Sequence, residues 1–144
     1  MPLPDPVPGL VISYVFLWRH QRDGGEEEGR KARPCAVVMT MTDEDGDRRV
    51  YVVPITHTPP DDDPHAVALP LKVKQRLGLD DQPSWIVTRE LNWFVWPGYD
   101  LRPVRRDRRD VFAWGMLPVE IFEAVRSGIG RHRRDRTLKL TPRL

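Results

Sequence analysis

Short apolar runs, separated by glycine, proline and acidic residues, recur along the first two thirds of this 144-residue chain. Runs of roughly four to eight apolar or β-branched residues bounded by such turn formers are typical of buried strands. Segment 43–47 is acidic, contains a glycine and predicts a turn between antiparallel neighbours. The pattern predicts strands at 10–16, 35–41, 49–55, 65–69, 85–88 and 93–96, the last two forming either one bent strand or two.

Two segments have the spacing of helices instead. Residues 71–77 follow Pro70 and stop at Gly78, and these residue types are favoured at the start and just past the end of a helix. Apolar residues recur at every fourth position from 117 to 129, and Pro118 suits the start of that helix. The chain is therefore predicted to be mainly β or α+β, a small antiparallel barrel with a short helix and a C-terminal amphipathic helix.

The length of the chain fits one domain with one real core. Residues 1–8 hold four prolines and predict a flexible arm, and residues 9–130 hold all the predicted strands and helices. Residues 18–31 are rich in charge and glycine, which predicts a solvated loop. Residues 131–144 form a basic tail that either frays or adds an edge strand.

The net charge of +2 hides a division along the chain. Residues 1–98 hold 11 Lys and Arg against 15 Asp and Glu, whereas residues 99–144 hold 12 against 6. An anionic partner for the basic part, or an arginine-rich solvated surface, explains this asymmetry. The single Cys35 excludes an internal disulfide, so we expect a reducing, cytoplasmic compartment. No export signal or membrane-spanning run is recognised, and no membrane partner is expected.

Candidate chemistry lies at the ends of two predicted strands. Arg30, Lys31 and Arg33 precede the strand at 35–41, and the polar step 56–58 follows the strand at 49–55. Pro34 lacks an N–H, so it belongs at a strand's first residue and keeps Arg33 extended just outside the sheet. If the two strands pair, Arg33 and the polar step meet at one rim. A guanidinium fork beside hydroxyls and an imidazole suits a phosphodiester, because it matches two phosphate oxygens at once.

Four features in order carry a family resemblance: the start at 9–12, the segment 29–38 with its Arg-Pro step, the segment 53–56, and the closing amphipathic helix. Together they resemble the PemK/MazF family of toxin endoribonucleases, the mRNA interferases of toxin–antitoxin systems, over residues 9–130. The resemblance implies a small SH3-like barrel that forms homodimers. It also implies cleavage of single-stranded RNA without a metal ion or other cofactor, and control by a cognate antitoxin.

The same resemblance assigns roles to residues. Arg33 matches the family's arginine at the scissile phosphate, Thr56 matches the threonine opposite it, and Glu90 falls at the family's acidic position. His57 stands where many relatives have a small residue, and its intrinsic pKa suits a general base, a role that Glu90 would serve equally if burial raised its own pKa. The neighbours of these residues are candidates for contact with RNA, namely Arg30, Lys31, Thr58, Arg89 and Asn92.

Other interpretations of the same residues are open. Arg33 can pair with the glutamates at 26–28, Thr56 can be a strand-end turn residue, and His57 can be a solvated loop histidine. Trp93 and Trp96 either stack on RNA bases or pack in the core. The three adjacent aspartates at 61–63 with His65 resemble a cation site, but carboxylates on a proline-broken loop do not converge easily, so no metal site is expected.

Two other functions also fit the predicted barrel. A toxin resembling CcdB would inhibit DNA gyrase without chemistry of its own. A nucleic-acid-binding regulatory module would use the basic tail and bind with strong salt dependence.

Overall fold

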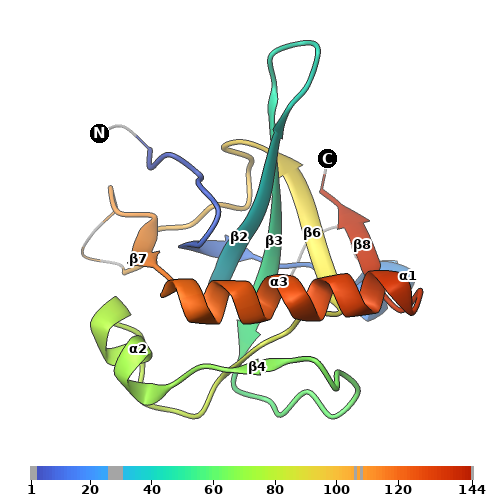
Figure 1. Ribbon diagram of the computed structural model, residues 1–144. Coiled ribbons are helices and arrows are strands. Elements are labelled where there is room, and N and C mark those ends of the chain that lie inside the picture. The colour runs from blue at the N-terminus through green and yellow to red at the C-terminus, as the bar shows by residue number, and fades with distance from the viewer. Residues whose placement is uncertain (1–2, 26–30, 106, 108, 144) are drawn as a thin grey trace.

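The computed structural model describes residues 3–25, 31–105, 107 and 109–143, and confirms the predicted class. A mainly antiparallel sheet curls into a half-barrel, and three helices are present in the described residues (Figure 1). The elements in chain order are β1 (Leu10–Val15), α1 (Arg19–Asp23), β2 (Ala32–Thr42), β3 (Arg48–Thr56), β4 (Val67–Ala68), α2 (Leu71–Leu77), β5 (Trp85–Ile86), β6 (Glu90–Val95), β7 (Ala113–Met116), α3 (Val119–Arg134) and β8 (Lys139–Pro142).

The long β2–β3 hairpin is the centre of the sheet. One path of pairing runs β4-β5-β3-β2-β1-β7, and β6 pairs with the outer half of β3 on the same side as β5. The strand β8 then adds to β6 in parallel, and the other pairings between named strands are antiparallel. Because β3 changes partner from β6 to β5 along its length, the end of β3 at Thr56 lies at a bend of the sheet.

Alternating side chains of the strands form two hydrophobic clusters, one on each face of the sheet. Val11, Ala36 and Val53 belong to the cluster that α2 and α3 cover, while Ile12 and Val52 belong to the cluster on the other face. This alternation is what a period of two residues produces on a strand. The sheet is therefore buried on both sides at its centre.

The helix α3 crosses the sheet face and reaches the loop before β4 (Figure 1). Gly128 makes this close approach possible. A Cβ atom there would lie 2.8 Å from the backbone oxygen of His65 and 2.9 Å from Cγ2 of Thr88. Any side chain would therefore push α3 away from the loop that carries His65.

Several expectations from sequence need correction. The segment predicted as a loop at 18–31 begins with helix α1, because the Gln21 side chain accepts the Trp18 N–H at 3.1 Å and Glu90 accepts the Arg19 N–H at 2.8 Å. The strand at 65–69 shrinks to β4. Of the two options left open for 85–88 and 93–96, the structure shows two separate strands, and the second begins at Glu90 rather than at residue 93. Pro34 is the third residue of β2 rather than its first, opposite Ser13, whose N–H and C=O bond Phe112 and Arg102 instead.

The C-terminal half holds two strands that the pattern did not settle. The strand β7 was missed, because Gly115 interrupts a four-residue segment that has no clear alternation. Residues 131–134 continue α3. For the rest of the tail, which was expected either to fray or to add an edge strand, the structure shows the strand β8 paired with β6. None of the helices in the described segments is long and apolar enough to cross a membrane.

Candidate active site

Arg33 and Thr56 lie together at one rim of the barrel, as the sequence predicted. In the β2–β3 ladder Cys35 is opposite Pro54, and the same antiparallel register continued by two residues places Arg33 opposite Thr56. Both side chains line a cavity of about 300 Å³. They also line a neighbouring cavity of about 310 Å³. The pair therefore stands on the wall between two cavities.

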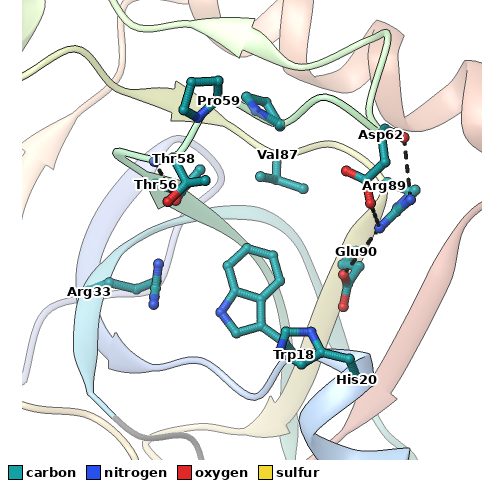
Figure 2. Close-up of a pocket in the computed structure, with 11 residues that line it drawn as sticks. Trp18, His20, Arg33, Thr56, Thr58, Pro59, Asp62, Val87, Arg89 and Glu90 are labelled. Atoms are coloured by element: carbon teal, nitrogen blue, oxygen red, sulfur yellow. Dashed lines mark hydrogen bonds and ion pairs between the residues drawn. The ribbon is translucent and has the colours of Figure 1, made fainter.

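The first cavity is shaped by residues from four separate segments (Figure 2). Trp18 and His20 come from the start of α1, Arg33 from β2, Thr56 from β3 and Glu90 from the start of β6. In the view of Figure 2 the Trp18 indole lies between Arg33 and Glu90. The guanidinium carbon of Arg33 is 5.2 Å from the centre of the Trp18 ring, a cation–π contact.

Arg33 has the properties of an anion-binding group. Its side chain is half-buried, and partial burial lowers the pKa of its guanidinium below the usual value, although the group stays protonated at neutral pH. Its buried Nε has no hydrogen-bond acceptor among the described residues. Among the described residues, Arg33 has no carboxylate within ion-pair distance. Because its guanidinium is partly desolvated, an anion that enters the cavity gains more from Arg33 than from a solvated arginine.

Thr56 and Thr58 present hydroxyls beside Arg33. Thr56 is buried, and its Oγ1 accepts the backbone N–H of Thr58 at 3.1 Å. Thr56 is therefore a turn residue at the end of β3, which is one of the two roles considered for it from sequence. Thr56 lines both cavities, and a hydroxyl that accepts one hydrogen bond can still donate its own hydrogen to an oxygen of a ligand.

Glu90 is buried, but part of its carboxylate already has a structural use. Its Oε1 accepts the backbone N–H of Arg19 at 2.8 Å, which anchors α1. Its Oε2 lies 3.7 Å from Nη2 of Arg89, and Arg89 in turn forms an ion pair of 2.5 Å with Asp62. Arg89 therefore lines the cavity as one half of a salt bridge (Figure 2).

His57 lines the second cavity and not the first. Its Nε2 lies 2.7 Å from a carboxylate oxygen of Asp80, and the other carboxylate oxygen accepts the Lys74 ammonium. The Lys74 side chain is buried and also donates to Ser84 Oγ and to the carbonyl of Gln82. Burial alone would raise the pKa of Asp80, but the hydrogen bonds from Lys74 and the Gln82 N–H, with the charges of Lys74 and His57, lower it overall. His57 is thus a half-exposed but oriented imidazole.

The remaining predicted residues are divided between rim and core. Lys31 is exposed and lines the second cavity, whereas Arg30 and the glutamates at 26–28 lie outside the described residues. Asn92 has no exposed surface, and its amide bonds the N–H and the C=O of Leu17. Asn92 therefore fixes the chain after β1 and does not reach a ligand in either cavity.

The two tryptophans and two of the three adjacent aspartates have structural roles. Trp93 packs against the cluster under α3 and Trp96 against the cluster on the opposite face, and neither lines a cavity described above. The aspartates at 61–63 point apart, since Asp62 pairs with Arg89 while Asp63 is buried against His132. Within the described residues, no three His, Cys, Asp or Glu side chains are grouped to hold a metal ion.

Sequence reasoning missed four residues of this region. Trp18 and His20 were assigned to a solvated loop, although an aromatic residue and a histidine directly after a strand are a usable signal for a cavity wall. Lys74 and Asp80 gave no signal, because their contact with the His57 loop joins segments that no periodicity connects. Comparison with family models and with curated proteins found no match to this chain.

Proposed function

We propose that this protein is an endoribonuclease that cleaves single-stranded RNA by attack of a ribose 2′-hydroxyl on the adjacent phosphate, without a metal ion. The observation that supports this most is the meeting of Arg33 and Thr56 on the wall between two cavities, with His57 on one and Glu90 on the other. The resemblance to the PemK/MazF family points to Arg33, Thr56 and Glu90 independently of the geometry, whereas His57 enters through its chemistry and its position alone.

The arrangement suits an in-line displacement at phosphorus. The 2′-oxygen forms a bond to phosphorus as the bond to the 5′-oxygen breaks, so proton acceptor and proton donor must stand on opposite sides of the phosphate. His57 and Glu90 occupy cavities that share Arg33, Thr56 and Thr58 as lining residues. In the proposed reaction His57 takes the proton of the 2′-hydroxyl, and a water molecule in the cavity beside Glu90 donates a proton to the departing 5′-oxygen. The products are a 2′,3′-cyclic phosphate and a 5′-hydroxyl.

Arg33 supplies charge stabilisation in this proposal. The crowded phosphorane carries more negative charge than the diester, and a preorganised donor aimed at developing charge is often the largest catalytic contribution. Asp80 would orient the imidazole of His57 and stabilise its charged form, as the aspartate of a Ser-His-Asp triad does. Thr56 would donate a hydrogen bond to a phosphate oxygen.

The biological setting is part of the proposal and rests on the family resemblance alone. We propose a toxin that acts as a homodimer in the cytoplasm and is neutralised by a cognate antitoxin. A small acidic protein encoded directly beside this chain, and able to block its activity when added to it, would support that setting.

The test is incubation of the purified protein with single-stranded RNA in the presence of EDTA. We expect wild-type cleavage with cyclic phosphate ends, a loss of about 10²- to 10³-fold in rate for Arg33→Ala, and a smaller loss for Thr56→Val. Arg126→Ala is the matched control. Arg126 is exposed on α3, and among the described residues it forms an ion pair only with Glu123. Equal rates for Arg33→Ala and Arg126→Ala would contradict the proposal.

Two outcomes would favour the other functions. RNA binding without cleavage by the wild type would indicate a nucleic-acid-binding module. DNA breaks in the presence of gyrase, without RNA fragments, would indicate a gyrase inhibitor.

A further inference from the structure

A third cavity, of about 330 Å³, adjoins the proposed active site. It lies between the end of α3, the start of β8 and the loop before β4. Asp62 and Arg89 line both this cavity and the first one, so their ion pair forms the boundary between the two. A strand of nucleic acid bound at Arg33 that passes over Arg89 enters the third cavity next.

The chemistry of this cavity fits a nucleotide. Arg136 and Lys139 bring positive charge to it, while His65 and Leu138 add an aromatic ring and an apolar side chain. Its two carboxylates are Asp62, which Arg89 neutralises, and Asp135, which is exposed at the end of α3. Cations therefore outnumber unpaired carboxylates in the lining, and a phosphate group is the ligand that two such cations and a ring accommodate together.

The backbone at Arg136 is a second, independent observation. Arg136 has a φ of 60°, and it is the non-glycine residue in the left-handed region among those the structure describes. The position directly after the C-cap of a helix ordinarily takes glycine in this conformation. An arginine is held there at a cost, and residues kept in such conformations cluster at functional sites.

We propose that the third cavity binds a further nucleotide of the same RNA strand, with its phosphate on Arg136 and Lys139 and its base against His65 and Leu138. This inference rests on the proposed function, because it extends the same RNA-binding groove. It assigns substrate positioning, not bond cleavage, to the corner formed by α3 and β8.

The experiment measures binding of 2′-fluoro RNA, which lacks the attacking hydroxyl, by fluorescence anisotropy at several salt concentrations. A dinucleotide is too short to fill both sites, whereas an octanucleotide spans them. The variant Arg136→Gly removes the guanidinium and suits the backbone. Arg133→Ala removes the same charge from an exposed position on α3 that does not line the cavity.

We expect Arg136→Gly to weaken octanucleotide binding roughly tenfold and to lower the slope of log affinity against log salt by about 0.7, the effect of one lost phosphate contact. Dinucleotide binding should stay unchanged, and Arg133→Ala should match the wild type. Equal losses for Arg136→Gly and Arg133→Ala, or no loss for either, would overturn the inference.

The same experiment separates this inference from the proposed function. If Arg33→Ala weakens binding of both lengths while Arg136→Gly affects neither, the active site stands and the third site does not. If the wild type binds neither length, both proposals fail.

Discussion

The carboxylate of Asp63 connects three segments around the site, and its replacement by asparagine gives a sharp test of the structure. Its Oδ2 accepts the backbone N–H groups of Thr88 at 2.7 Å and Arg89 at 3.1 Å. Its Oδ1 accepts the N–H of His65 at 3.0 Å and lies 2.6 Å from Nε2 of His132 on α3. Because the side chains of Asp63 and His132 are only 1% and 3% exposed, water does not replace these bonds.

Asp63→Asn keeps the shape of the side chain but replaces one carboxylate oxygen by an NH₂ group. In either orientation of the amide, that NH₂ group faces two hydrogen-bond donors. Each buried donor left unsatisfied costs about 1–3 kcal/mol. His132 can relieve one of them by changing tautomer, so we expect a loss of about 2–4 kcal/mol in the free energy of unfolding. Guanidinium denaturation followed by tryptophan fluorescence measures it. Asp62→Asn is the control, because the side chain of Asp62 is 66% exposed and its surface ion pair is worth about 1 kcal/mol or less.

The pH dependence of this loss follows from the direction of the pKa shift. Burial alone would raise the pKa of Asp63, but the hydrogen bonds from His132, Thr88 and His65 lower it below its usual value. A carboxyl whose folded pKa is depressed stabilises the fold fully above its unfolded value of about 3.9 and loses that effect as pH falls through the folded pKa. The gap between wild type and Asp63→Asn should therefore shrink in acid, as the Asp63 carboxyl becomes protonated. Equal stabilities of Asp63→Asn and Asp62→Asn at pH 7 would refute this reasoning.

Two further predictions concern stability. Lys74→Met should cost about 1–3 kcal/mol in denaturant unfolding, because it leaves the buried Ser84 Oγ without the donor that Lys74 supplies, while the half-exposed Asp80 stays hydrated; an unchanged midpoint would contradict this. Gly128→Ala should lower the melting temperature, since its Cβ would meet the His65 carbonyl, whereas Gly130→Ala on the same helix has ordinary contacts and should gain about 0.5–1 kcal/mol. Effects of the same sign for the two glycines would show that α3 does not pack against the loop as described.

The pairing of Arg33 with Thr56 was predictable because it depends on local rules. Two adjacent apolar runs joined by a short acidic turn form a hairpin, and a hairpin brings the start of one strand opposite the end of the other. The residue types at those two positions then suggest the chemistry. Neither step needs knowledge of distant parts of the chain.

Asn92 and Asp80 show where such rules stop. Glu90 and Asn92 are two residues apart on β6 and so share a face of the sheet, but Glu90 lines the cavity while Asn92 lies one step deeper, under the chain after β1. The alternation along β6 predicts which face of the sheet each side chain lies on. It does not predict how deeply the side chain is buried, because that depends on where α1 packs. Asp80 reaches His57 only because the loop after α2 folds back onto the end of β3, a tertiary contact without a periodic signal.

The two loops beside the proposed active site are held by buried charges more than by apolar packing. Residues 57–66 are mostly polar or proline, and Asp63 ties them to α3 and to the start of β6. Residues 78–84 are similar, and Lys74 ties them to α2 through Asp80 and Ser84. Both aspartates have a lowered pKa, so both anchors are intact at neutral pH and weaken in acid in the same direction. The walls of the cavities around Arg33 and Thr56 therefore depend on two polar networks that hydrophobic patterning does not reveal, although it locates the strands between them.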